Sequence, residues 1–181
     1  MSRKILIIST SLRAKSNSDL LAQAFMKGAL EAGHQVEKVS LRGKNIAFCR
    51  GCLACQKLGK CVIPDDANEI TEKMKTADVI VWATPIYYYE MSGAMKTMID
   101  RANALFAANP AFRDVYLLSS AADDDPHADE RALQGLGGWI ACYEKSRLAG
   151  SVLACGVTDE GEAEGSEALR RACELGRTLQ G

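Results

Sequence analysis

Two short apolar runs, each followed by a polar loop and then by a segment of helical periodicity, constrain the fold of this chain most strongly. Residues 4–8 and 78–84 are rich in β-branched residues and lack the polar–apolar alternation of a half-exposed strand. Such runs are typical of strands that are buried on both faces of a parallel sheet. Parallel neighbours need a crossover connection, which is usually a helix. The pattern therefore predicts an α/β fold built from strand–helix units.

The same alternation continues along the chain. Further strands are expected at 34–40, 114–120 and 150–156, and helices at about 19–32, 67–76, 93–103, 133–143 and 168–179. Residues 34–40 alternate as an edge strand does, whereas the first and third strands are apolar enough to be central. Right-handed crossovers then favour a doubly wound three-layer sandwich with a five-stranded parallel sheet of order 2-1-3-4-5. Ligands bind such sheets at the switch point, here between the first and third strands.

Length and charge exclude several classes of protein. A chain of 181 residues can bury one sizeable core, so a single domain over 1–181 is expected. The net charge is −1 with both signs mixed, which leaves no basic surface for nucleic acid or for anionic lipid. The N-terminal apolar run is too short for a signal peptide, and no stretch is long enough to span a membrane. We therefore expect a soluble cytoplasmic protein that binds neither nucleic acid nor a membrane.

The loop after the first strand carries five hydroxyls, an asparagine and two cations within ten residues. Ser18 is a suitable N-cap for the helix that follows. A hydroxyl-rich turn at a helix N-terminus offers hydrogen-bond donors and the positive end of the helix dipole to a phosphate. The candidate phosphate contacts are Ser9, Ser11, Arg13, Ser16, Asn17 and Ser18. The alternative is an ordinary polar turn with a helix cap.

At this point the sequence resembles a known family, nearly from end to end. The resemblance lies in the motifs Ser11–Arg13 with Ser16–Ser18, Thr84–Tyr87, Met91–Lys96, Ile99–Arg101 and Cys155–Gly161. These are similar to the flavodoxin-like NAD(P)H-dependent FMN reductases, and more closely to the branch that includes the iron–sulfur flavoproteins. One departure is Thr10, where the family often has glycine. The resemblance implies a flavodoxin-like fold with bound FMN and with NAD(P)H as a transient electron donor.

The loop after the third strand suits a flavin ring, which needs an apolar wall and backbone donors. Proline stiffens the turn, and aromatic and thioether side chains can pack along the ring. The candidate contacts are Pro85, Ile86, Tyr87, Tyr88, Tyr89 and Met91, with Ser119 and Ala121 from the loop after the fourth strand. Alternatively, some of the tyrosines cover the sheet edge or a subunit contact. No strand is followed by Gly-x-Gly-x-x-Gly, so a resident dinucleotide is not expected.

Four cysteines form the sharpest local pattern in the chain. Cys49, Cys52 and Cys55 recur at intervals of three, and Cys61 follows closely. This spacing resembles the ligation of a [4Fe–4S] cluster and occurs in the iron–sulfur flavoproteins. Zinc ranks second, because structural zinc usually takes two separated ligand pairs, and free thiols are the main rival. The remaining Cys142, Cys155 and Cys173 are expected to be small core residues.

The expected function is an FMN-dependent oxidoreductase in which the flavin, rather than a side chain, carries the chemistry. Electrons would come from NAD(P)H or a reduced carrier such as ferredoxin. They would pass to quinone, flavin or a similar acceptor, with the cysteine loop lying over or beside the flavin pocket. The alternatives are an electron-transfer protein without its own small-molecule substrate, and a regulatory domain that has lost its flavin. An apolar, tyrosine-rich site at an open edge favours a homodimer or homotetramer.

Overall fold

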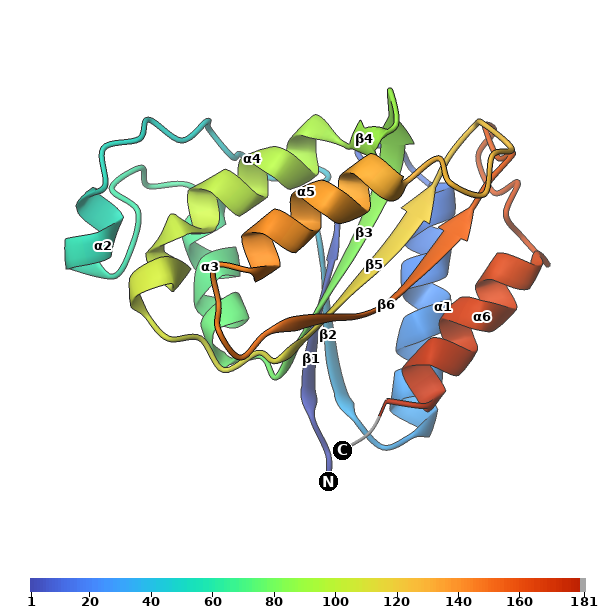
Figure 1. The fold of residues 1–181 in the computed structure, drawn as a ribbon, viewed down its shortest axis with the longest axis horizontal. Helices are drawn as coiled ribbons and strands as arrows, with labels where there is room; N and C mark the ends of the chain where they lie inside the picture. Colours follow the sequence, from blue (N-terminus) through green and yellow to red (C-terminus); the bar gives the residue numbers. More distant parts are fainter. Residues whose placement is uncertain (180–181) are drawn as a thin grey trace.

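A computed structural model, which describes residues 1–179, shows a parallel sheet with helices on both faces (Figure 1). Its main strands are β1 (Lys4–Ser9), β2 (Gln35–Ser40), β3 (Val79–Tyr87), β5 (Asp114–Ser120) and β6 (Arg147–Ala154). They lie in the order β2-β1-β3-β5-β6, and each pair of neighbours is parallel. The predicted fold class and order 2-1-3-4-5 are thus confirmed. The expected single domain over 1–181 stays a prediction, and its last two residues lie outside the described part.

One strand was not predicted. The two-residue strand β4 (Glu90–Met91) pairs antiparallel with the end of β3. It folds the chain back over the carboxyl edge of the sheet before the next helix begins. The pairing is too short to leave a periodic signal in the sequence.

The helices form two layers. On one face lie α1 (Asn17–Glu31) and α6 (Glu167–Arg177), and on the other lie α3 (Asp66–Thr76), α4 (Gly93–Arg101) and α5 (Glu130–Ile140) (Figure 1). A 3-10 helix, η1 (Ala102–Ala107), continues α4, and the short α2 (Ala54–Leu58) lies within the cysteine loop. Asp65 caps α3, and Ser16 caps α1 instead of the predicted Ser18. The hydroxyl of Ser16 accepts from the N–H of Asp19.

Each central strand is buried on both faces. On β1, Leu6 and Ile8 pack with the layer of α3, α4 and α5, whereas Ile5 and Ile7 pack with α1 and α6. All four side chains are at most 2% exposed. This two-sided burial explains why the sequence of β1 shows an unbroken apolar run.

Helices α1 and α6 approach each other through glycines. A Cβ added at Gly28 would lie 1.9 Å from the carbonyl oxygen of Cys173, and one at Gly176 would lie 2.2 Å from that of Phe25. Both obstacles are backbone atoms of the facing helix. The two helices therefore pack with their backbones in near contact.

The cysteines outside the loop do not all lie in the core. Cys142 and Cys155 are exposed and Cys173 is partly exposed, so the expectation of three core residues was wrong. Cys142 follows α5 and Cys155 follows β6, where the periodic pattern says little about burial, whereas Cys173 lies within α6 and is only partly covered. Within residues 1–179, no helix combines the length and the apolar character needed to cross a membrane.

Candidate functional site

The carboxyl ends of β1, β3, β5 and β6 meet at one cavity of about 150 Å³. The predicted residues that line this cavity are Ser11, Arg13, Ser16, Asn17, Pro85, Ile86 and Tyr87. Six further residues complete it. Ser120 and Ala122 belong to the predicted stretch after β5, around 119–123, whereas Val157, Thr158, Asp159 and Glu160 were not predicted. The first and third strands are paired up to Ser9 and Ala83, so the loops that follow them start side by side. The cavity therefore lies at the switch point of the sheet.

The N-terminus of α1 lies at one end of this cavity. The hydroxyl of Ser18 is fully buried and has no hydrogen-bond partner among the described residues. Ser16 and Ser11 line the cavity beside it, and Ser9 is buried beneath them. Free N–H groups at a helix N-terminus and the helix dipole both favour a phosphate at this position.

Two predicted phosphate contacts are engaged with the loop after β6. Arg13 donates to the carbonyl oxygen of Thr158 at 2.8 Å. The side-chain amide of Asn17 donates to the carbonyl oxygen of Asp159 at 2.9 Å and accepts from the N–H of Ala163 at 3.1 Å. Asn17 therefore holds this loop against the start of α1. Arg13 keeps further N–H groups that can face an anion, since a guanidinium has five.

A buried hydroxyl network joins the first two loops. Thr10 donates to the carbonyl oxygen of Ala83 at 3.0 Å and lies 3.2 Å from the hydroxyl of Ser92. Thr84 donates to the same Ser92 hydroxyl at 3.1 Å. Ser92 is also the N-cap of α4. Thr10 thus uses its side chain to connect the phosphate loop to α4, which a glycine could not do.

The turn between β3 and β4 carries the three tyrosines. Tyr88 and Tyr89 both have left-handed backbones, with φ of 52° and 64°. Tyr87 lines the cavity, whereas Tyr88 is 95% exposed. The hydroxyl of Tyr89 donates to Asp123 at 2.7 Å, which raises the pKa of Tyr89 and lowers the pKa of Asp123. This bond ties the turn to the loop after β5.

The remaining candidates lie just behind the cavity wall. Met91 is buried and packs in the core beneath α5. Ser119 donates to the buried Asp129 at 2.5 Å, and Ala121 is buried, whereas their neighbours Ser120 and Ala122 line the cavity. The alternation of a strand explains this one-residue offset. The wall from 157 to 160 could have been found because it follows the last parallel strand, whose end lies at the same edge of the sheet.

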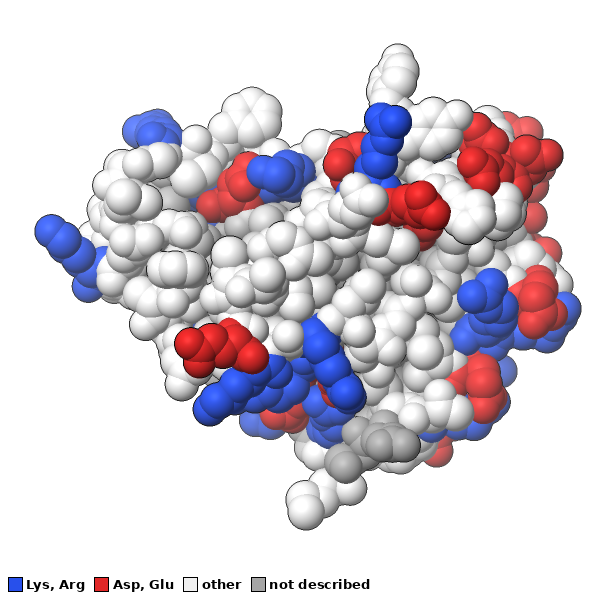
Figure 2. All heavy atoms as spheres, in the orientation of Figure 1, with Lys and Arg blue, Asp and Glu red and all other residues white. Residues whose placement is uncertain are grey.

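Acidic side chains gather at one side of the cavity mouth. The exposed members follow β5 and β6 and are Asp123, Asp124, Asp125, Asp159, Glu160, Glu162 and Glu164. Figure 2 shows this gathering at the upper right, where Figure 1 draws the loops after β5 and β6. Arg13 donates to the carbonyl oxygen of Thr158, and the carbonyl oxygen of Lys15 accepts from the N–H of Gly161, so both residues contact the part of this rim that follows β6. The mouth of the site is thus bordered by negative charge.

The four loop cysteines lie at the opposite end of α4. Cys49, Cys52, Cys55 and Cys61 line one small enclosed cavity of about 30 Å³. Its wall includes Arg101, at the C-terminal end of α4, whereas the flavin-side loops contact α4 at its N-cap. The nine residues of α4 separate the two ends by about 12 Å. Within one copy of the chain, the cysteine loop therefore does not lie over or beside the first cavity, and that expectation was wrong.

Donors point at two of the sulfurs. The N–H of Gly51 donates to the sulfur of Cys49, and the side-chain amide of Asn103 donates to that of Cys55, both at 3.4 Å. Among residues 1–179, no three His, Cys, Asp or Glu side chains converge closely enough to hold a metal ion. The donor set suits a thiolate-bound centre, but the loop must tighten to bring the sulfurs to one point.

The sheet order, and the switch-point cavity with a helix N-terminus at one end, define a flavodoxin-like protein. The chain belongs to the NADPH-dependent FMN reductase family, whose model matches residues 3–172.

Relatives of known name agree with this assignment. An iron–sulfur flavoprotein of Methanosarcina thermophila is 32% identical over 138 residues, which are 76% of this chain and 72% of that protein. An iron–sulfur flavoprotein of Methanocaldococcus jannaschii is 38% identical over 102 residues, 56% of this chain and 53% of that protein. The chain thus spans about half the length of several such relatives.

Solved structures share the fold. The NAD(P)H:quinone oxidoreductase from Methanothermobacter marburgensis has a TM-score of 0.73 at 18% identity, over 99% of this chain and 100% of that one. An azoreductase from Bacillus anthracis has a TM-score of 0.73 at 15% identity, over the same shares. At these identities the likeness concerns the fold alone.

Proposed function

We propose that this chain is an FMN-dependent oxidoreductase that takes electrons from NAD(P)H or a reduced carrier. It would pass them to quinone, flavin or a similar acceptor. The observation that carries the proposal is the meeting of a helix N-terminus and an aromatic turn at one switch-point cavity. The family match over residues 3–172 supports the same cofactor. When bound, FMN supplies the hydride and single-electron chemistry, so no side chain is needed as nucleophile or base.

The cavity divides the cofactor between two environments. Its volume of about 150 Å³ is below the roughly 300 Å³ at which ligand pockets begin, so it suits the phosphate and the sugar chain. Ser11, Arg13 and Ser18 would then hold the phosphate at the start of α1. The ring would lie in the open mouth against Ile86 and Tyr87, with one face left accessible to NAD(P)H.

Flavin content and its reduction test this proposal. The purified protein is expected to carry FMN at about one per chain, and rapid mixing with NADH or NADPH should bleach the flavin bands. An electron-transfer protein without its own substrate would carry FMN but would be bleached by neither nucleotide. A domain that has lost its flavin would show no flavin bands even after FMN is added.

For the cysteine loop, we propose a [4Fe–4S] cluster bound by Cys49, Cys52, Cys55 and Cys61. Their spacing, their place around one cavity and the names of the relatives support it. After anaerobic purification, about four irons and four sulfides per chain are expected. Cys52→Ala should abolish the iron and leave FMN in place. Stoichiometric FMN without iron or labile sulfide would contradict the cluster. If the protein instead carried zinc and no iron, the four cysteines would be a zinc site.

The surroundings of the site support further parts of the proposal. Tyr87 and Tyr88 are exposed beside the cavity in the single chain. Exposed aromatic side chains at this position suit a surface that a second copy of the chain covers in a homodimer or homotetramer, or a docking site for a carrier such as ferredoxin. All seven cysteines are free. Free thiols in this number suit a reducing, cytoplasmic compartment.

A further inference from the structure

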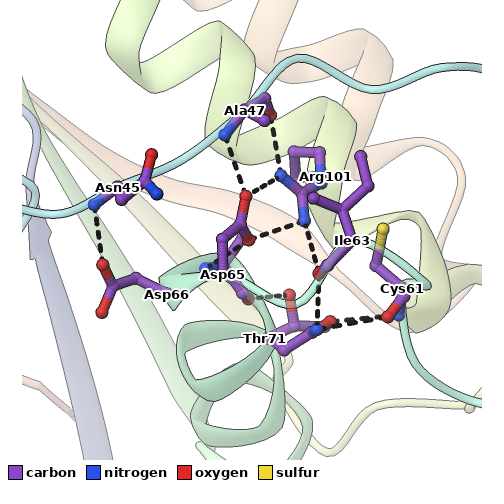
Figure 3. Close-up of polar contacts among 10 residues, drawn as sticks. Asn45, Ala47, Cys61, Ile63, Asp65, Asp66, Thr71 and Arg101 are labelled. Carbon is purple, nitrogen blue, oxygen red and sulfur yellow. Dashed lines mark hydrogen bonds and ion pairs between the residues drawn. The ribbon is translucent and has the colours of Figure 1, made fainter.

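A buried ion pair joins α4 to the start of α3. The side chain of Arg101 is fully buried and that of Asp65 is 4% exposed. Two N–H groups of Arg101 donate to the two carboxylate oxygens of Asp65, at 2.5 and 2.7 Å (Figure 3). This parallel, two-bond geometry is the strongest that an arginine and a carboxylate form.

The pair also grips both ends of the cysteine loop. Arg101 donates to the carbonyl oxygen of Ala47 at 2.7 Å and to that of Ile63 at 3.3 Å. Asp65 accepts from the N–H of Ala47 at 2.9 Å. Ala47 lies two residues before Cys49, and Ile63 lies two residues after Cys61. One ion pair therefore closes residues 48–62 into a loop.

The same guanidinium forms part of the wall of the cysteine cavity. Its Nε is buried and has no hydrogen-bond partner among the described residues. A guanidinium stays protonated in proteins, so the charge of Arg101 is permanent. Lys57 and Lys60 lie on the loop itself and are exposed, so Arg101 provides the buried positive charge at this cavity.

We infer that Arg101, held by Asp65, is the positioning residue of the cysteine loop. It fixes both ends of residues 48–62 and places a desolvated positive charge against the thiols before any metal binds. For the second role this inference rests on the proposed cluster, whose negative charge Arg101 would offset. For the first role it rests on contacts of the chain alone.

Hydrogen–deuterium exchange of the metal-free protein tests the first role. In Arg101→Gln, amides of residues 47–62 should lose more than about tenfold in protection, because the buried carboxylate of Asp65 loses its partner. Arg101→Lys keeps the charge but cannot form both bonds, and should lose less. Peptides of α1 should be unchanged. The matched control is Arg113→Gln, since Arg113 is also partly buried and donates to two carbonyl oxygens, but those of Pro110 and Phe112, outside the cysteine loop.

Wild-type protection of residues 47–62 in Arg101→Gln would overturn the inference. If Arg101→Gln loses FMN and loses protection throughout the chain, the variant is unfolded, and the exchange of Arg101→Lys is measured in its place. A loss confined to residues 47–62 supports the positioning role, and no loss contradicts it. Asp65→Asn should reproduce the local loss, because it removes the other half of the pair.

Iron loading separates this inference from the cluster itself. If wild-type protein takes up iron, Arg101→Gln should take up less, and the fraction that is loaded should have a more negative reduction potential, because a positive charge near the centre favours its reduced form. An unchanged potential would overturn the charge role. If wild-type protein takes up no iron, the cluster is wrong, while the exchange result still decides whether Arg101 positions the loop.

Discussion

At the scale of single residues, Asp114 joins three strands of the sheet. It begins β5 and accepts from Arg3 at 2.6 Å and from Arg147 at 2.8 Å. Burial alone would raise the pKa of Asp114, but hydrogen bonds from Arg147 and Arg3 outweigh it and lower the pKa. A carboxylate with a lowered folded pKa stabilises the fold above its ordinary pKa of about 3.9, and this stability is lost as the pH falls through the folded value.

Asp114→Asn should therefore lower the free energy of unfolding by about 1–3 kcal/mol near neutral pH. The difference from wild type should shrink near pH 3, where the unfolded carboxylate is protonated first. Urea unfolding at both pH values measures it. Asp100→Asn is the control, because Asp100 pairs with the exposed Lys96. An equal loss at both pH values would show that geometry, not charge, matters at Asp114.

A second prediction at this scale concerns the phosphate. Arg13→Ala and Ser18→Ala should each weaken FMN binding by roughly tenfold to a hundredfold, or about 1.5–3 kcal/mol, because each removes one donor to a dianion. Fluorescence titration of the flavin measures the affinity, and Arg42→Ala is a control for loss of an exposed arginine elsewhere. Unchanged affinity in both variants would place the phosphate at another site.

At the scale of elements, the contact between α1 and α6 depends on Gly28. Gly28→Ala would push a methyl group into a backbone carbonyl 1.9 Å away, which no side-chain rearrangement can relieve. We expect a loss of more than about 2 kcal/mol in unfolding free energy. Gly138→Ala in α5 meets nothing within 4 Å and should instead stabilise by about 0.5–1 kcal/mol. Opposite signs in thermal unfolding would confirm the helix contact, and equal signs would contradict it.

The turn between β3 and β4 stores strain in two consecutive left-handed tyrosines. Tyr88→Asn should stabilise the protein by about 1 kcal/mol, since asparagine tolerates this backbone and the lost side chain is 95% exposed. Thermal unfolding of the FMN-free protein measures it. A lower melting temperature would mean that Tyr88 makes contacts that outweigh the strain.

At the scale of the whole molecule, the charge is uneven although its sum is −1. The acidic rim beside the cavity repels the extra phosphate that distinguishes NADPH from NADH. Asp124→Asn with Asp125→Asn should therefore lower the KM for NADPH more than that for NADH. Added salt should have the same effect on the wild type, because it screens exposed charges. Equal changes for both nucleotides would show that the rim does not face the nicotinamide donor.

Much of this architecture could be predicted from the sequence. β1 and β3 are buried on both faces, so their apolar runs fixed a parallel sheet, and the alternation in β2 marked its edge. The strand order followed from these two facts and from the handedness of crossovers. The polar loop at the start of α1 could be recognised because helix N-termini need polar caps, although the cap is two residues earlier than expected.

The rest depends on long-range contacts that no local pattern carries. The two ends of the cysteine loop are joined through Arg101 and Asp65, which are 36 residues apart. Neither their spacing nor the periodicity of the sequence predicts that these two residues pair. The wall from 157 to 160 is held by Asn17, whose partners are about 145 positions away. Such pairings appear only once the fold has brought the segments together.

The closure of residues 48–62 by one ion pair has a consequence for how such proteins diversify. The segment lies between β2 and α3 and contributes no strand to the described sheet. Arg101 binds the backbone at both of its ends, and Asn68, Lys75 and Asn103 add contacts with Cys61, Gly59 and Cys55. The residues between its two fixed ends can therefore vary independently of the sheet. A related sheet with an arginine at the end of α4 and an aspartate at the cap of α3 should accept a loop of different length or chemistry without refolding. The scaffold can therefore exchange this segment for another while the cavity at the carboxyl edge of the sheet stays unchanged.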